Sequence, residues 1–272
     1  MLRSLWTAAS GMIAQQTNVD TIANNLANVN STGYKTEKAE FKTLLYQTLQ
    51  TRTTTANGEF KPIGAQVGLG VRNSSIDSNF TQGIMTETQE LTDFCIEGNG
   101  FFAVVGPDGE TYYTRNGHFN FSLGENNTMA LCNDGGYPVL DTNGNPIRLG
   151  AQYRISQISV STTGQLMYKD ENNNPQPMGI SIGLYQFNNP AGLTKTSGTT
   201  YQESDASGAV MNEQDLGQNL RSVIHQGYLE GSNVQVADEM VNLIVAQRAY
   251  EMNSKAIQAS DEMMGQANAL RR

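Results

Sequence analysis

The chain has 272 residues and a net charge of −9, with 38% hydrophobic and 16% charged residues. Both fractions lie below the roughly 45–50% and 25% of an average globular protein. The negative charge argues against nucleic acid or anionic lipid as the main partner. No run of about 20 apolar residues is present, so no membrane insertion is expected.

The first residues lack the apolar run of about 7–15 residues that a cleaved signal peptide requires. A cytoplasmic protein and a protein exported through an uncleaved N-terminus both fit this pattern. Cys95 and Cys132 are the two cysteines of the chain. We interpret them as buried free thiols, with a disulfide as the alternative. No cofactor and no metal are expected, because His118 and His225 stand far from other ligand types in the sequence.

Residues 1–35 are predicted to form an N-terminal helix that ends near residue 30, where Thr32-Gly33 supplies a stop signal. One face of this helix is rich in amide side chains, including Asn24 and Asn28, which lie one turn apart. Amides can bond to neighbouring helices without desolvating a charge, so we favour an interface over a solvated face. The apolar side chains recur at heptad spacing, and they are Leu5, Met12, Val19 and Leu26, with Ala8, Ile22 and Val29 between them.

Residues 36–80 are expected to form a connecting arm. Its first part, residues 35–50, is interpreted as a short helix or an extended arm. Residues 51–66 are interpreted as a hairpin or a long loop, because Asn57-Gly58, Pro62 and Gly64 disfavour a helix.

Residues 81–205 have short apolar or alternating runs separated by Gly and Asn turns. This pattern is typical of strands in a small barrel or sandwich. No crossover helices interrupt it, so an antiparallel domain is predicted. Residues 206–232 are polar and irregular, and we expect them to return the chain as a connector.

Residues 233–272 are predicted to form a second helix more than ~50 Å long, with Ser232 or Asn233 as its cap. A helix of that length needs a partner along its apolar stripe. The expected fold is therefore α+β: two terminal helices pairing as a coiled coil, with a central antiparallel β-rich domain. The stripe contains Val234, Ala237, Val241, Val245, Met252, Ala256, Ala259, Met263 and Leu270.

No motif for catalysis is found: the chain lacks a P-loop, a dinucleotide fingerprint, HExxH and CxxC. The loop from Asp141 has the first spacings of a calcium site but Gln152 at its twelfth position, so an Asn-Gly turn is favoured. A carbohydrate-binding module has some support from the aromatics of residues 112–121, although core packing explains them better. A cell-wall hydrolase has no supporting motif.

Several motifs carry a resemblance to a known family. They are ANNLANVNSTGYK near the N-terminus, IEGNGFFAV, YTRNGHFNF and FNNPAGL in the middle, and GYLEGSNV with QRAYEMNSK near the C-terminus. Together they resemble the flagellar rod and hook axial proteins over essentially the whole chain. LLYQTLQ followed by a polar insertion and GAQVGLGVR is similar to the distal rod members, and proximal rod members are the alternative.

The resemblance implies a non-enzymatic, self-assembling subunit of the basal-body rod, which transmits motor torque to the hook and encloses an export channel. It implies export across the cytoplasmic membrane without a cleaved signal. The implied partners are further copies in a helical array, neighbouring rod and hook-type proteins, the surrounding ring bushing and the export apparatus. The implied rod-stiffening segment includes Tyr46, Gln47, Asn57, Gly58 and Pro62. The implied subunit interface includes Leu5, Met12, Val19, Ile22, Asn24, Leu26, Asn28, Val29, Val241, Val245, Met252, Ala256, Ala259 and Met263.

Overall fold

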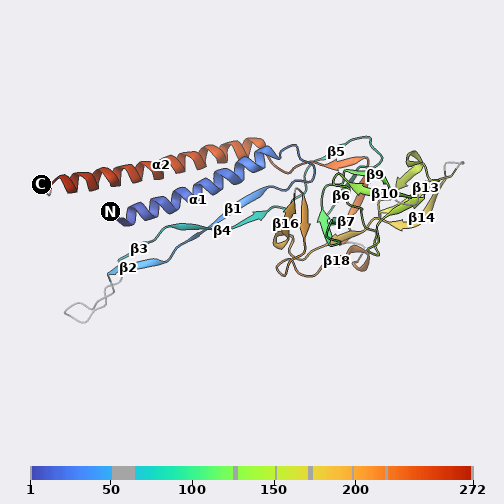
Figure 1. Ribbon diagram of the computed structural model, residues 1–272, viewed down its shortest axis with the longest axis horizontal. Coiled ribbons are helices and arrows are strands. Elements are labelled where there is room, and N and C mark those ends of the chain that lie inside the picture. Colours follow the sequence, from blue (N-terminus) through green and yellow to red (C-terminus); the bar gives the residue numbers. More distant parts are fainter. Residues whose placement is uncertain are drawn as a thin grey trace. The chain divides into compact units, whose positions relative to one another are not determined.

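The computed structural model describes residues 2–50, 65–124, 128–150, 152–170, 174–197, 199–217 and 220–270. The chain divides into two compact units. The helical unit comprises residues 1–27, 37–77 and 235–272, and the β unit comprises residues 28–36 and 78–234. Figure 1 shows two helices in the first unit and a strand-rich second unit, so the predicted α+β class is confirmed.

Two helices, α1 (Leu2–Ala27) and α2 (Val236–Ala269), lie side by side in the helical unit. They are antiparallel, because the start of α1 meets the end of α2: the hydroxyl oxygens of Ser4 and Ser260 are 3.2 Å apart. At the other end, the amide of Asn25 donates to Glu239 Oε2 at 3.3 Å. Helix α1 ends before residue 30, and α2 begins after residue 233, so both are shorter than predicted.

The predicted cap of α2 is wrong. Gln235 occupies the cap position and makes no side-chain capping bond. The Asn233 side chain is instead used inside the β unit, where its oxygen accepts from the Thr36 backbone N–H at 2.8 Å and its nitrogen donates to Asn79 O at 2.9 Å. A side chain that bridges two other segments cannot also cap the helix.

The arm that follows α1 is built from strands. β1 (Glu37–Thr43) pairs with β4 (Val71–Ser78), and β2 (Tyr46–Gln50) pairs antiparallel with β3 (Ala65–Gly68). The helical interpretation of residues 35–50 is therefore wrong and the extended one is confirmed. The prediction of a hairpin or loop at residues 51–66 falls almost entirely on residues 51–64, outside the described residues.

The β unit is assembled from several small sheets. One sheet of six strands has the order β16-β17-β8-β7-β15-β18, two sheets have three strands each (β11-β10-β9 and β12-β13-β14), and β19 pairs with β6 and β20 with β5. All these pairings are antiparallel, as predicted. Residues 206–232, expected to be a connector, contribute β18, β19 and β20.

The bounds of the remaining strands are β5 Met85–Glu87, β6 Phe94–Glu97, β7 Phe101–Val105, β8 Thr111–Thr114, β9 Phe119–Leu123, β10 Thr128–Asn133, β11 Arg148–Gly150, β12 Ile158–Val160, β13 Gln165–Lys169, β14 Pro175–Ser181, β15 Leu184–Gln186, β16 Thr194–Ser197, β17 Thr200–Gln202, β18 Met211–Asn212, β19 Val223–Gln226 and β20 Tyr228–Glu230. In the described ranges, the single-turn helices η2 Ile155–Gln157, η3 Pro190–Gly192 and η4 Glu213–Asp215 lie between strands.

Aromatic and aliphatic side chains from these sheets form the core of the β unit. Phe119 is buried in one cluster and Tyr113 in another, and Tyr112 and Phe121 pack against the cluster that contains Phe119. The aromatics of residues 112–121 therefore serve core packing, as favoured, and do not form an exposed platform for sugar. Cys95 and Cys132 are buried and free, which confirms their interpretation as thiols.

Candidate assembly interface

The two helices of the chain meet along a seam of small and polar side chains. A Cβ placed on Gly11 would lie 2.9 Å from Asn253 Nδ2, so the glycine lets the helices approach closely. In the described part of α2, the buried residues are Ala246 and Ser260. The facing pairs recur at multiples of seven residues on both helices, and they are Ser4 with Ser260, Gly11 with Asn253 and Asn25 with Glu239.

Asn25 anchors one end of this seam. Its side-chain oxygen accepts from the Glu37 backbone N–H at 2.9 Å, and its nitrogen donates to Glu37 O at 2.8 Å and to Glu239 Oε2 at 3.3 Å. The side chain is 1% exposed. It therefore ties α1, β1 and α2 together, and an Asn is needed because it donates and accepts at once.

The apolar stripe predicted on α2 lies on the outside of the helix pair. Val241 is 59% exposed and Met252 is 65% exposed. The stripe therefore does not pack on α1 within the chain, and the expectation that the two stripes face each other is wrong for a single copy. The exposed members are Val241, Val245, Met252, Ala256, Ala259 and Met263.

The predicted positions of α1 are divided between the seam and its flanks. Ile22 is buried, whereas Asn24 is exposed and donates to Glu37 Oε2 at 3.1 Å. The half-buried positions are Leu5, Met12, Val19 and Leu26 on the helix, and Asn28 and Val29 directly after it. The four helical positions recur at heptad spacing, so their half-buried apolar side chains lie along one stripe of α1.

Sequence reasoning missed two large side chains on α1. Trp6 is 74% exposed and Ile13, one heptad further on, is 66% exposed. It also missed a groove of about 390 Å³ between the helices, lined by Gln16, Val19, Gln247, Tyr250 and Glu251. The heptad spacing of Trp6 and Ile13 is visible in the sequence, but the groove depends on how the helices are rotated.

The implied rod-stiffening segment is described in part. Tyr46 and Gln47 lie in β2, where Tyr46 is 62% exposed. Its neighbour Leu45 is 83% exposed. Asn57, Gly58 and Pro62 lie outside the described residues.

The β unit contains a buried charge cluster, which the sequence did not indicate. Lys35 Nζ lies 2.6 Å from Glu230 Oε1, and Arg115 Nε lies 3.6 Å from Glu230 Oε2. All three side chains are at most 2% exposed. Burial lowers the pKa of both Lys35 and Arg115. Lys35 also donates to Thr81 O, and Arg115 donates to Gly98 O and Gly100 O, so the cluster joins five segments of the unit.

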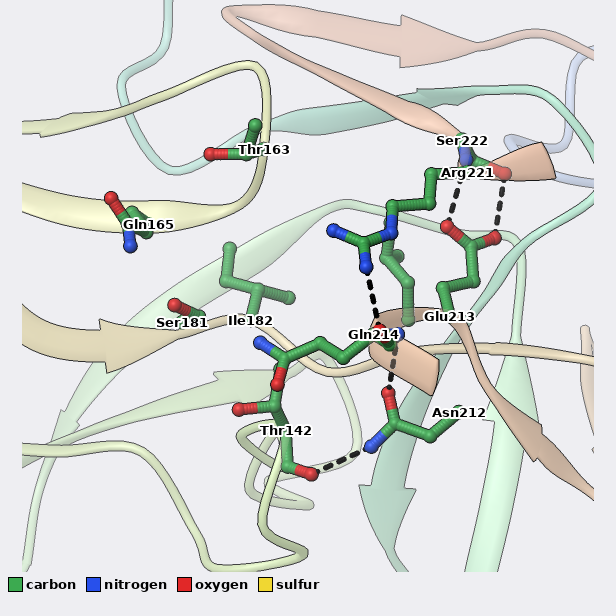
Figure 2. A pocket seen from close by; sticks show the side chains of 11 residues that line it. Thr142, Thr163, Gln165, Ser181, Ile182, Asn212, Glu213, Gln214, Arg221 and Ser222 are labelled. Atoms are coloured by element: carbon green, nitrogen blue, oxygen red, sulfur yellow. Dashed lines mark hydrogen bonds between the residues drawn. The ribbon is translucent and has the colours of Figure 1, made fainter. Parts of the chain in front are cut away.

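A polar pocket of about 270 Å³ lies elsewhere in the β unit (Figure 2). Glu213 accepts from the backbone N–H and the hydroxyl of Ser222, both at 2.7 Å, and Arg221 donates to Gln214 O at 2.6 Å. Asn212 donates to Thr142 O at 2.8 Å. These polar groups bond to other residues that line the pocket, so the pocket has a structural role.

Within the part of the chain that the structure describes, no group of three or more His, Cys, Asp or Glu side chains is arranged to hold a metal ion. Neither α1 nor α2, as described, is long and apolar enough to cross a membrane.

Comparison with known proteins matches three family models along the chain. They are "Flagella basal body rod protein" at residues 5–35, "Flagellar hook protein FlgE/F/G D1 domain" at residues 95–168 and "Flagellar basal body rod FlgEFG protein C-terminal" at residues 225–270. The first match covers most of α1, and the last covers β20 and α2.

Curated relatives align along the whole chain. The flagellar basal-body rod protein FlgG of Borreliella burgdorferi is 44% identical over 100% of both chains. FlgG of Buchnera aphidicola subsp. Acyrthosiphon pisum is 40% identical over 99% of this chain and 100% of its own. FlgG of Agrobacterium fabrum is 40% identical over 96% of this chain and 97% of its own. The chain therefore belongs to the family of flagellar basal-body rod proteins, which confirms both the resemblance and the predicted role as a structural part of the flagellar basal body.

Proposed function

We propose that this chain is the self-assembling subunit of the distal rod, the drive shaft that carries motor torque to the hook and surrounds the export channel. The observation that carries the proposal is the exposed apolar stripe of α2 beside a seam that is already closed by other residues. The distal position is supported by relatives that bear the name FlgG along the full chain. The proximal rod remains the alternative position.

The exposed stripe needs a partner for physical reasons. Fully burying one Val or Met side chain contributes about 1.5–3 kcal/mol. Val241, Val245, Met252 and Met263 are each more than half exposed, so most of that contribution is still to be gained. The stripe runs along a helix of 34 residues, and the partner must therefore be equally long.

A second copy of the chain supplies such a partner. In this proposal, coiled-coil packing forms between copies through the stripes of α1 and α2, and the seam holds each copy's own helices together. The subunit interface is then the set predicted from the sequence, from Leu5 to Val29 and from Val241 to Met263. Neighbouring rod and hook-type proteins, the ring bushing and the export apparatus are proposed as further partners.

The proposed stiffening role belongs to the β2–β3 ribbon. Tyr46 and Leu49 on β2 are 62% and 53% exposed. A two-stranded ribbon is marginally stable alone in water, so contact with other subunits would both order it and restrict bending. Asn57, Gly58 and Pro62 belong to this proposal through the sequence resemblance.

Electron microscopy of the concentrated full chain tests the proposal. We expect straight tubes from the unchanged chain. A variant with Val241, Val245 and Met252 changed to Ser should remain folded, because these side chains are exposed, but should stay monomeric. Tubes from this variant, or none from the unchanged chain at any concentration, would contradict the proposal.

A further inference from the structure

We infer that Trp6 of one copy docks in the groove between α1 and α2 of a second copy. The groove is the one lined by Gln16, Val19, Gln247, Tyr250 and Glu251. This inference rests on the proposed self-assembly and specifies one contact through which it occurs.

Trp6 has the properties of an interface anchor. It is the single tryptophan of the chain and is 74% exposed. It follows Ser4 by two positions, which at ~100° per residue places it on the side of α1 away from the seam. Tryptophan is the residue type most enriched among those that dominate binding energy, and it gains most from a desolvated pocket.

The groove has the size and chemistry to accept an indole ring. Its volume is about 390 Å³, whereas a cavity of ~150 Å³ already binds benzene. Val19 and the ring of Tyr250 supply apolar and aromatic surface. Gln16, Gln247 and Glu251 lie around them, and an acceptor among these groups suits the indole N–H, which can only donate.

Charge supports the same pairing. Arg3 lies one turn before Trp6 and on the same face. The first turn of α1 contains no acidic residue, so a cation there opposes the helix dipole and gains nothing within its own helix. The groove is lined in part by Glu251, whose carboxylate pairs with Arg248 at 2.9 Å on the same helix. When Trp6 enters the groove, Arg3 is brought to an acidic helix: α2 contains Asp238, Glu239, Glu251, Asp261 and Glu262 against Arg248 and Lys255.

The occupant must be a second copy. Gln16 and Val19 lie 10 and 13 residues beyond Trp6 on the same straight helix, or ~15–20 Å along its axis. A copy's own tryptophan therefore cannot reach its own groove. Val19 follows Trp6 by 13 residues, which at ~100° per residue places the two side chains about 140° apart around α1. A contact between two such different surface regions is head-to-tail, and such contacts propagate instead of closing into a dimer. That property suits a rod.

The test uses the fluorescence of the full chain, in which Trp6 is the sole tryptophan. We expect its emission to move to shorter wavelength as the chain assembles, because the ring leaves water. In Tyr250→Ala the shift should be lost or clearly reduced at equal pelleted mass. Assembly without any shift would overturn the inference and leave self-assembly intact.

A double-mutant cycle on the critical concentration for pelleting gives a second measurement. Trp6→Ala should raise it about 30-fold, the effect of losing one dominant contact. Trp6→Ala with Tyr250→Ala should be little worse than Trp6→Ala alone, because both variants remove the same contact. Additive effects, or no effect of Trp6→Ala, would overturn the inference.

Ile84→Ala is the matched control. Ile84 is 78% exposed and lies in the β unit, so its loss should leave the critical concentration unchanged. Far-UV circular dichroism of each monomer should match that of the unchanged chain. Failure of the unchanged chain to pellet at any concentration would overturn both the proposed function and this contact. Pelleting without the effects expected for Trp6 would overturn the contact alone.

Discussion

Replacing the buried carboxylate of Glu230 by an amide should strongly destabilise the β unit. Glu230→Gln keeps the shape of the side chain but removes the negative charge that Lys35 and Arg115 share. Breaking a buried ion pair from one side costs about 3–5 kcal/mol, because the remaining charge stays desolvated. Here two cations remain, so we expect a loss in the upper part of this range.

The cluster has two cations for one carboxylate, and this imbalance makes a second prediction from the same reasoning. Lys35→Met leaves Arg115 and Glu230 as a balanced pair, so it should cost less than Glu230→Gln. If the carboxylate variant is the milder of the two, the charge argument is refuted even though both lose stability.

Urea unfolding and thermal unfolding, each followed by far-UV circular dichroism, measure these losses. For a unit of this size, ~1 kcal/mol lowers the midpoint of thermal unfolding by about 2–4 °C, so Glu230→Gln should lower it by about 10 °C or more. Glu97→Gln is the matched control: Glu97 also pairs with a basic side chain, His225, at 2.8 Å, but is 55% exposed. Its loss should cost at most ~1 kcal/mol. A loss below ~1 kcal/mol for Glu230→Gln would refute the reasoning.

Three further perturbations give separate tests. Asn25→Ala removes the bonds to Glu37 and Glu239 from a buried site, and should lower the unfolding free energy of the helical unit by about 2–3 kcal/mol in urea melts; Asn24→Ala, at an exposed site, should cost well under half as much. Gly11→Leu should separate the helices, because even a Cβ would lie 2.9 Å from Asn253, and a drop in helix protection by hydrogen exchange would detect this. Burial raises the pKa of Cys95 from 9.0 to about 11, so the unfolded chain loses this proton first and the β unit should lose stability between about pH 9 and 11. Cys95→Ala should lessen that loss in melts at pH 8 and 10, and an identical pH dependence in both proteins would contradict the assignment.

The terminal helices and the central strands could be predicted because their periods are local properties of the chain. The residues of the seam could not be predicted. The heptad expected from hydrophobicity is offset from the seam by one residue. The heptad chosen from hydrophobicity runs through Leu5 and Met12, whereas the seam runs through Ser4 and Gly11. One residue corresponds to ~100° around a helix. Apolar side chains were assigned to the intrachain contact, but the chain closes that contact with small and polar ones.

Other features depend on residues far apart in the sequence. Residues 35–50 adopt strands because β4 and β3 pair with them, and no local pattern reveals those partners. Asn233 looked like a helix cap, but it lies beside Thr36 and Asn79. The Lys35–Glu230 pair was equally invisible, since isolated charges in a sequence are normally exposed.

The Lys35–Glu230 pair also constrains when the β unit can finish folding during synthesis of the chain. The two residues are separated by 195 positions, and Thr36 and Asn233 make a second bond across almost the same interval. The contacts that close the β unit are therefore among the most non-local ones in it. Non-local contacts form slowly. A growing chain cannot complete this unit before residue 233 leaves the ribosome, so nearly the whole polypeptide is synthesised before either end of the β unit can be locked.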